Sequence, residues 1–202
     1  VDRRLRGGAW LAQNLRSDSR QLHGNTVGIN GFGRIGREVA RRLAGWNVRI
    51  VYHDIAEIPP EVEREFAAER LPFEALLKTS DIVTLHVPLT PATRHMINRE
   101  TLALMKPGAM LINCARGPVV EERALAEALR SGRLGGAGLD VFEVEPPGFP
   151  SIFAEFHNVA LTPHIAPGTA DIMRMKMEEI WADVTSFFAG RAMTNVVVAG
   201  PG

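Results

Sequence analysis

The chain has 202 residues, of which 46% are hydrophobic, enough for one sizeable core but hardly for two full domains. Its 23 basic residues balance 23 acidic residues without a long block of either sign, so we expect neither nucleic acid nor an anionic membrane as a partner. The single cysteine, Cys114, excludes an intrachain disulfide, and no apolar run approaches a membrane span or a signal-peptide core, which favours a soluble cytoplasmic protein.

Residues 1–20 are expected to form a helical arm ahead of the core. A Gly-Gly pair at 7–8 would weaken this helix near its start. The apolar residues recur there at a loose helical period: Leu5, Trp10, Leu11 and Leu15. The core domain is expected over residues 21–195, followed by a tail at 196–202.

The first strand, turn and helix carry a glycine fingerprint. The apolar run at 26–30 predicts a buried strand, and the pattern at 35–43 predicts a helix with Ile35, Val39 and Leu43 on one face. Between them stand Gly31, Gly33 and Gly36. In a dinucleotide-binding turn such glycines permit the tight turn, the approach of a pyrophosphate and close helix packing, while the helix N-terminus offers free N–H donors. This context predicts nucleotide binding rather than an ordinary strand–helix turn.

A second strand, predicted over 48–52, ends at His53-Asp54. An acid belongs at about this position in a dinucleotide-binding unit, where it accepts hydrogen bonds from both ribose hydroxyls. The same carboxylate would repel a 2′-phosphate. Asp54 therefore predicts NAD rather than NADP, unless Arg49 or His53 turns toward the phosphate.

Helical patterns and short apolar runs alternate along the rest of the chain. A charged helix is expected over 61–68, and the compressed segment 69–73 leaves little room for a third full strand. Further strands and helices follow in turn: strands at 81–85, 109–113, 135–139 and 159–161, and helices at 100–105, 121–131 and 169–189. The alternation predicts an α/β fold of the doubly wound, Rossmann type, a parallel sheet covered on both faces with ligand at the carboxyl ends of the strands.

Arg116 lies just past the predicted strand at 109–113. At this end of the sheet its guanidinium could grip a carboxylate through two hydrogen bonds. The alternative is a surface arginine that pairs with Glu121 or Glu122. Because Arg116 accompanies a dinucleotide turn and a histidine at another strand end, we favour the substrate-binding role.

His164 follows the strand at 159–161 and the Thr162-Pro163 pair, which places an imidazole at a strand end. A carboxylate hydrogen-bonded to one ring nitrogen would fix the tautomer of the imidazole and favour its protonated form. Such a pair can act as a general acid and base. Glu143 and Glu145 are both candidates for the carboxylate, and spacing alone does not choose between them.

Several other residues have an expected place. Asp140 closes the strand at 135–139 and would either cap a turn or contact a nicotinamide ring, and the backbone of 86–90 could line the cofactor groove. Cys114 is expected to be a small buried packing residue, since no histidine lies near it in sequence. Aromatic and sulfur-containing side chains are expected in the core or at an interface: Trp10, Trp46, Trp181, Met173, Met175 and Met177.

With these motifs, the chain resembles the nucleotide-binding domain of the D-isomer-specific 2-hydroxyacid dehydrogenases, which include phosphoglycerate and glyoxylate/hydroxypyruvate dehydrogenases. The resemblance runs from about Trp10 to Asn195 and is carried by six segments: 27–36, 85–90, 105–109, 113–117, 139–146 and 161–165. It implies that Glu145, the last glutamate before the proline, is the catalytic acid. It also implies that Arg116 binds the substrate and that His164 is the general acid and base.

The resemblance further implies NAD as cofactor, a small 2-hydroxy or 2-oxo acid as substrate and a homodimer to which the arm contributes. No metal is expected. The residues expected at the cofactor are Gly31, Gly33, Arg34, Ile35, Gly36, Asp54, Val87, Pro88, Thr93, Cys114, Ala115 and Asp140.

Three observations bear on the simplest version of this hypothesis. The substrate domain of the family is expected to be largely absent here, so the chain could bind NAD without turnover, since one wall of the cleft would not exclude water. Corepressors related to the family share the same three catalytic residues, which leaves an NAD-sensing module as the alternative function. The segment 28–36 also resembles glyceraldehyde-3-phosphate dehydrogenase, but the reactive cysteine in its Ser-Cys-Thr-Thr context is missing.

Overall fold

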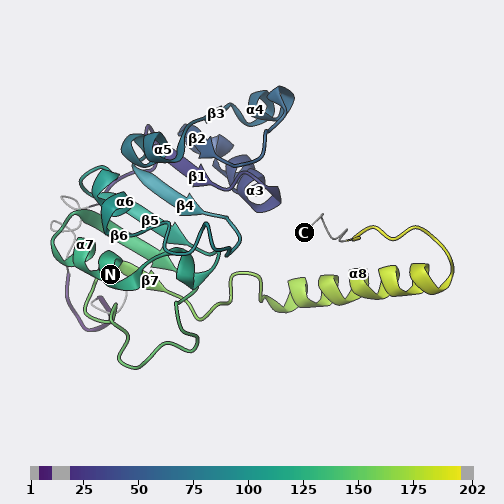
Figure 1. Cartoon of the computed structure of the whole chain (residues 1–202). Helices are drawn as coiled ribbons and strands as arrows, with labels where there is room; N and C mark the ends of the chain where they lie inside the picture. The colour runs from purple at the N-terminus through teal and green to yellow at the C-terminus, as the bar shows by residue number, and fades with distance from the viewer. Residues whose placement is uncertain (1–4, 11–18, 197–202) are drawn as a thin grey trace.

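The protein is described by a computed structural model that covers residues 5–10 and 19–196. Its centre is a parallel sheet with the order β3-β2-β1-β4-β5-β6-β7 (Figure 1). The strands are β1 (Thr26–Asn30), β2 (Arg49–His53), β3 (Ala68–Arg70), β4 (Ile82–Leu85), β5 (Ala109–Asn113), β6 (Leu134–Leu139) and β7 (Val159–Leu161). The chain winds outward from β1 to β3 and then returns to add β4 to β7 on the other side. The prediction of a doubly wound fold is confirmed, and its switch point lies between β1 and β4.

The third strand is as short as the compressed sequence predicted. The helix before it ends at Phe66, where Ala67 takes a left-handed conformation with φ +47°. Only three residues then pair with β2, from Ile50 opposite Ala68 to Tyr52 opposite Arg70. The edge of the sheet on this side is therefore a single short strand.

The helices are α3 (Arg34–Leu43), α4 (Pro60–Phe66), α5 (Phe73–Thr79), α6 (Arg99–Leu104), α7 (Glu122–Arg130) and α8 (Ala170–Phe188), with 3-10 turns at η1 (Ala44–Trp46) and η2 (Gly117–Val119). Our sequence analysis did not predict α5. This helix begins after Pro72, has seven residues and buries Leu76 and Leu77 in the core. Its length is shorter than the window over which helical periodicity is informative.

Two hydrophobic clusters lie on opposite faces of the sheet. One joins alternate residues of β1 and β2, such as Ile29 and Tyr52, to α3 and α4. The other joins the opposite face, including Val51, Val83 and Leu111, to α5, α6 and α7. Met110 of β5 belongs by register to the α3 face, yet 40% of it is exposed. Among the described residues, coverage of both faces is thus complete at β1 but not at β5.

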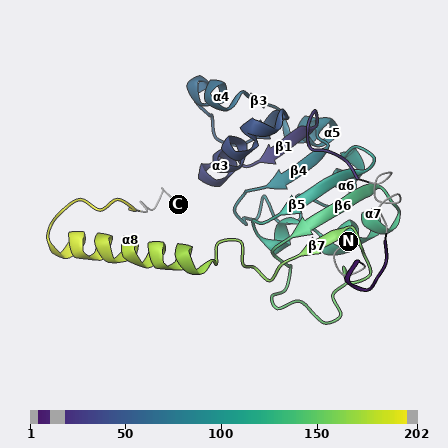
Figure 2. The ribbon, with the colours of Figure 1, turned by 180° about the vertical axis from the view of Figure 1, so that it is seen from behind.

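The last helix, α8, extends away from the sheet in both views (Figures 1 and 2). None of its residues is buried. Its exposed side chains include the three methionines at 173, 175 and 177 and Trp181, which is 70% exposed. The core alternative is therefore excluded for these residues within this chain, as it is for Trp46 and for Trp10, which is 82% exposed, and their place at an interface stays a prediction. An apolar helix without a buried face is typical of a helix that another part of an assembly covers.

The ends of the chain are described only in part. In the segment 5–10, Leu5 and Arg6 are helical and the backbone turns at Gly8, which has φ +86° and donates to Leu5 O. Leu11 and Leu15, on which the predicted arm depends, lie outside the described residues, as do residues 197–202 of the predicted tail. None of the helices that the structure describes is both long and apolar enough to cross a membrane.

Candidate active site

The three glycines of the fingerprint have the distinct surroundings that the sequence predicted. Gly31 has φ +94°, and a Cβ there would lie 2.7 Å from the carbonyl carbon of His86. A Cβ on Gly36 would lie 2.1 Å from Gly31 O, so this glycine lets α3 pack against the turn. Around Gly33, by contrast, no described atom lies within 4 Å of such a Cβ. The open space at Gly33 is where a pyrophosphate could approach the backbone, so the turn fits a dinucleotide.

The start of α3 is open to an anion. Gly33 is its N-cap, no side chain caps it, and its first turn holds no acidic residue. The free N–H groups and the positive end of the helix dipole therefore remain available to a phosphate. Ile35 was placed on one apolar face with Val39 and Leu43, yet it is 67% exposed, and its neighbour Arg34 is also exposed. The helix instead buries Gly36 and Ala40, because the close contact with the turn is made by the glycine.

Asp54 is held beside the glycine turn, at the carboxyl end of β2. Its Oδ2 accepts a hydrogen bond from Phe32 N (2.7 Å) and its Oδ1 accepts one from Ala56 N (2.9 Å). Neither basic neighbour turns toward a 2′-phosphate. Arg49 lies at the opposite end of β2, 2.5 Å from Glu69, and His53 Nδ1 lies 3.2 Å from Leu71 O. The placement agrees with a ribose-binding role for Asp54, which stays a prediction.

Arg70 is a residue near this position that our sequence analysis missed. It is the last residue of β3, and its guanidinium donates to Asp54 O (3.0 Å) and to Ala56 O (3.3 Å). A cation therefore lies next to the predicted ribose-binding acid. Only the parallel pairing of β3 with β2 brings the two residues together, and no motif in the sequence marks Arg70.

The loop after β4 closes the other side of the glycine turn. His86 N donates to Asn30 O (2.7 Å), and burial lowers the pKa of His86 to about 4, so its ring is neutral at neutral pH. Thr93 Oγ1 donates to Pro88 O (2.6 Å), and Val87 packs against the core. The predicted cofactor-lining segment is therefore a loop held by hydrogen bonds and packing, which place Val87 and Pro88 beside the switch point.

A buried polar atom lies at the same place. Asn30 Oδ1, at the end of β1, has no hydrogen-bond partner among the described residues, although Asn30 is fully buried. Its Nδ2 lies 3.4 Å from the sulfur of Met96. An unsatisfied buried acceptor is rare in folded proteins, and it is located directly before the glycine turn.

Arg116 is oriented by the end of β5. The buried side chain of Asn113 donates to Arg116 O and accepts from Ala115 N, each at 3.0 Å. The guanidinium itself is exposed and donates to Ala115 O (2.7 Å), not to Glu121 or Glu122. The surface-pair alternative is therefore not what the structure shows. The head group of Arg116 lies close enough to Glu145 for its charge to contribute to the lowered pKa of that carboxyl.

Cys114 does not have the buried position that we expected. It follows β5 directly and is exposed. Partial desolvation, together with the negative charge of Asp140, raises the pKa of its thiol. A thiol that resists ionisation is a poor nucleophile, so thiol catalysis is disfavoured as the sequence indicated.

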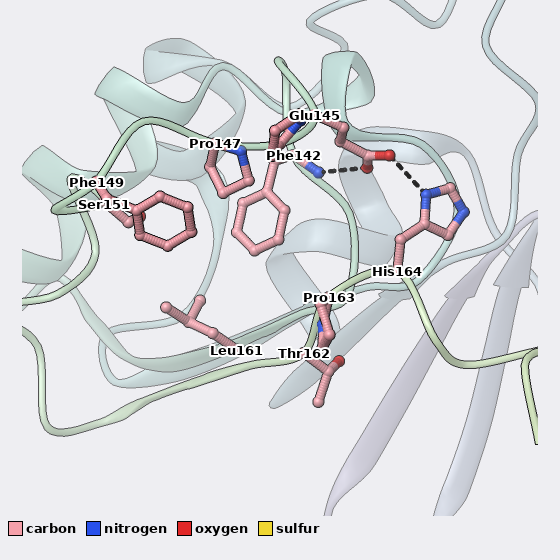
Figure 3. Close-up of a pocket in the computed structure, with 10 residues that line it drawn as sticks. Phe142, Glu145, Pro147, Phe149, Ser151, Leu161, Thr162, Pro163 and His164 are labelled. Atoms are coloured by element: carbon pink, nitrogen blue, oxygen red, sulfur yellow. Dashed lines mark hydrogen bonds and ion pairs between the residues drawn. The ribbon is translucent and has the colours of Figure 1, made fainter.

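His164 and Glu145 form a hydrogen-bonded pair (Figure 3). His164 Nδ1 lies 2.6 Å from Glu145 Oε2, and Glu145 Oε1 accepts from Phe142 N at 3.0 Å. The hydrogen bond from His164, followed by the one from Phe142 N, lowers the pKa of Glu145. The pair therefore contains an ionised carboxylate, and it leaves Nε2 of the imidazole on the far side of the ring. Of the two glutamates that the sequence left open, the geometry selects Glu145.

Asp140 fixes the loop that carries His164. Its buried carboxylate accepts hydrogen bonds from Thr162 Oγ1 (2.5 Å), Ile165 N (2.9 Å) and Ala166 N (2.9 Å), and its carbonyl accepts from His164 N (2.8 Å). Burial alone would raise the pKa of Asp140, but these hydrogen bonds lower it, so the carboxylate is ionised. His164 is held with φ +51°, a left-handed conformation that is uncommon for a non-glycine residue. Asp140 is thus a turn cap, and its contact with a nicotinamide ring stays a prediction.

An apolar cavity of about 430 Å³ adjoins the pair (Figure 3). His164 and Glu145 both line it. The other walls are mostly apolar and come from the segments around Glu145 and from the end of β7 and the residues after it: Phe142, Pro147, Phe149, Leu161 and Pro163. The catalytic candidates therefore border a space whose other walls are mostly apolar.

All of these groups lie at the carboxyl edge of one sheet. The strands β1, β2 and β4 end at the glycine turn, Asp54 and the 87–93 loop, and β5, β6 and β7 end at Arg116, Asp140 and His164. The fold and the site together define a dinucleotide-binding domain that carries an acid–base pair beside an arginine.

Comparison with known proteins gives the family. The model of the D-isomer specific 2-hydroxyacid dehydrogenase NAD-binding domain matches residues 1–166, so the chain belongs to this family and carries its NAD-binding domain. Glyoxylate reductase of Thermococcus onnurineus is 44% identical over 202 residues, 98% of this chain and 60% of that protein. Hydroxypyruvate reductase of Thermotoga maritima is 42% identical over 172 residues, 84% of this chain and 54% of that protein. Both of these relatives are named as reductases.

Solved structures agree with the fold. The holo form of D-mandelate dehydrogenase from Rhodotorula graminis matches with a TM-score of 0.89 and 32% identity, over 99% of this chain and 61% of that chain. An NAD-complexed D-isomer specific 2-hydroxyacid dehydrogenase from Lactobacillus delbrueckii ssp. bulgaricus matches with a TM-score of 0.79 and 35% identity, over 86% of this chain and 56% of that chain. The chain thus spans about 60% of the length of the first relatives that it matches.

Proposed function

We propose that this protein transfers a hydride between NAD(H) and a small 2-hydroxy or 2-oxo acid, with glyoxylate and hydroxypyruvate as the first substrates to test. The observation that carries the proposal is the 2.6 Å contact between His164 Nδ1 and Glu145, formed at the same sheet edge as Arg116 and the glycine turn. The names of the glyoxylate and hydroxypyruvate reductases that the chain resembles support the substrate class.

Each of the three side chains has a role that follows from its contacts. Arg116 is exposed, and its guanidinium has N–H donors besides the one that is hydrogen-bonded to Ala115 O, so it would bind the substrate carboxylate. His164 would give a proton to the substrate oxygen from Nε2 during reduction and accept it during oxidation. Glu145 would hold the tautomer and stabilise the imidazolium through Nδ1.

The cofactor would be held by the first half of the sheet. The open space at Gly33 and the free N-terminus of α3 would take the pyrophosphate, and Asp54 would accept the ribose hydroxyls. Bound NADH supplies the hydride from C4 of its nicotinamide. Because Asp54 is ionisable and neither Arg49 nor His53 faces it, we propose a preference for NADH over NADPH.

We also propose that the protein works as a cytoplasmic homodimer. The exposed apolar side chains of α8 and the half-exposed Met110 give it surface that an assembly would cover. Sedimentation at micromolar concentration tests the dimer, and a monomer under these conditions would contradict it.

The function is tested by binding and turnover measured on the same sample. NADH titration should show saturable binding, with NADPH bound more weakly. NADH oxidation should then be seen with glyoxylate or hydroxypyruvate, with pyruvate as a third acid. Tight NADH binding without oxidation by any of the three acids would contradict the proposed turnover and leave only the nucleotide site.

A further inference from the structure

A second histidine–glutamate pair lies next to the catalytic pair. His95 Nε2 is 3.1 Å from Glu143 Oε1, and Glu143 is two positions before Glu145. His95 and His164 are two of four non-glycine residues with positive φ among the described residues, at 50° and 51°. Such conformations persist only where surrounding contacts enforce them, and they concentrate at functional sites. The proposed reaction gives His95 and Glu143 no role.

Glu143 and Glu122, at the start of α7, are joined by two reciprocal hydrogen bonds between side chain and main chain. Glu143 Oε1 accepts a hydrogen bond from Glu122 N (3.1 Å), while Glu143 N donates to Glu122 Oε1 (2.8 Å). Burial, together with the negative charge of Glu143, raises the pKa of Glu122. Two carboxyl groups therefore meet here, and His95 supplies a donor on the side of Glu143 that faces the 93–97 loop.

His95 also joins its loop to the loop that carries Arg116. His95 N donates to Pro118 O (2.8 Å), and Ile97 N donates to Val119 O (3.1 Å). The backbone of Gly117 lies so close to the 142–143 segment that a Cβ would be 1.8 Å from Phe142 O. The segments at 95–97, 116–122 and 142–145 thus interlock, and one of them carries Arg116 while another carries Glu145.

We propose that His95 and Glu143 are positioning residues, which hold the Glu145 segment in register with the Arg116 loop so that the carboxylate-binding group and the proton-transfer pair face one substrate. The part of this inference that concerns turnover rests on the proposed function. Neither residue touches the substrate, since both act through Glu145 and Arg116. Small displacements of reacting groups are costly, on the order of 100-fold in rate for about 1 Å.

A purely structural role predicts a different outcome. The side chains of His95 and Glu143 are 41% and 31% exposed, and ion pairs with that much exposure contribute little to stability. The positioning role therefore predicts a loss of kcat without a matching loss of stability. The control is Glu127→Ala, which removes an exposed ion pair with Arg99, and neither residue belongs to the interlocked segments.

The test combines turnover with a spectroscopic signal that needs no substrate. The proton on His164 Nδ1, bonded to Glu145, should give a low-field proton resonance in the NADH-free protein, identified by its loss in His164→Ala. Glu143→Ala should displace or broaden this resonance and lower kcat on the order of tenfold, with NADH affinity unchanged. Glu143→Gln keeps an acceptor for Glu122 N and should retain both the resonance and most of the kcat.

A second variant guards against a folding defect. His95→Asn keeps a residue that tolerates the left-handed backbone but is too short to make the same contact with Glu143, and it should lower kcat in the same direction. An unchanged resonance and kcat in Glu143→Ala, or a resonance change shared by Glu127→Ala, would overturn the inference. If the unmodified protein reduced none of the three acids, the proposed function would fail, while the resonance would still decide whether Glu143 positions the pair.

Discussion

The half of the sheet that contains β1 and β2 and the half that contains β5 to β7 hold their functional groups in different ways. At β1 and β2 the main chain supplies most of the groups: the glycine turn and the uncapped start of α3 offer N–H groups, and the carboxylate of Asp54 is fixed beside them. At β5 to β7, side chains hold other side chains, as Asp140 fixes the His164 loop and Asn113 fixes Arg116. The groups suited to bind a cofactor are therefore mostly main-chain groups fixed by the fold, whereas the groups suited to proton transfer depend on a network of specific side chains.

The largest effect on turnover is expected at His164. His164→Ala should lower kcat on the order of 1000-fold, because it removes the proton-transfer group, while NADH affinity stays within about twofold. NADH titration and steady-state oxidation with glyoxylate measure the two quantities. His157→Ala, at an exposed histidine outside the site, should leave both unchanged. Undiminished turnover in His164→Ala would disprove the assignment of the acid–base group.

Glu145→Gln should lower kcat on the order of 100-fold, because the amide no longer stabilises the imidazolium. The hydrogen bond from His164 lowers the pKa of Glu145 below the ordinary value of 4.5. The stability that the ionised carboxylate contributes is therefore present above pH 4.5 and is lost as the pH falls through the folded-state pKa.

The measurement is the difference in Tm between the unmodified protein and Glu145→Gln. This difference should be present at neutral pH and shrink as the pH falls below 4.5, since glutamine does not titrate. Asp140 titrates in both proteins and cancels in the difference. A difference in Tm that stayed constant through the acid range would show that the charge of Glu145 does not contribute to stability.

In the half of the sheet that contains β1 and β2, Asp54→Ala should weaken NADH binding on the order of tenfold, because hydrogen bonds to a charged acceptor are lost. The preference for NADH over NADPH should also decrease, because Arg70 lies beside the position that Asp54 leaves and should raise the affinity for NADPH. The double variant Asp54→Ala/Arg70→Ala should lose the gained NADPH affinity. Equal NADH affinity before and after the Asp54 change would exclude the ribose-binding role.

The sequence allowed the strands and the glycine turn to be predicted because apolar runs bounded by polar residues are local signals. What it could not show depends on contacts between distant segments. Glu143 and Glu145 stand two positions apart on an irregular segment, and only the fold brings His95 to one and His164 to the other. Arg70 likewise meets Asp54 only through the pairing of β3 with β2.

Other differences have a similar origin. Ile35 fits a helical period, yet Gly36 makes the contact with the turn, because that contact is too close for a side chain. The apolar side chains of α8 were expected in the core or at an interface, and the sequence pattern does not distinguish these two places. Cys114 was expected inside because cysteine is often buried, whereas its position just past β5 leaves it at the surface.

The smallest expected effects distinguish two glycines of the same turn, Gly33 and Gly36. Gly36→Ala places a Cβ 2.1 Å from Gly31 O and should destabilise the fold by about 1–3 kcal/mol through overpacking. Gly33→Ala meets no described atom within 4 Å at an ordinary φ of −74°, so its unfolding free energy should stay within about 0.5 kcal/mol. The added methyl group would instead obstruct the space for the pyrophosphate and weaken NADH binding by roughly fivefold. Denaturant unfolding and NADH titration on both variants would show the two effects separately, and an intact NADH affinity in Gly33→Ala would place the pyrophosphate elsewhere.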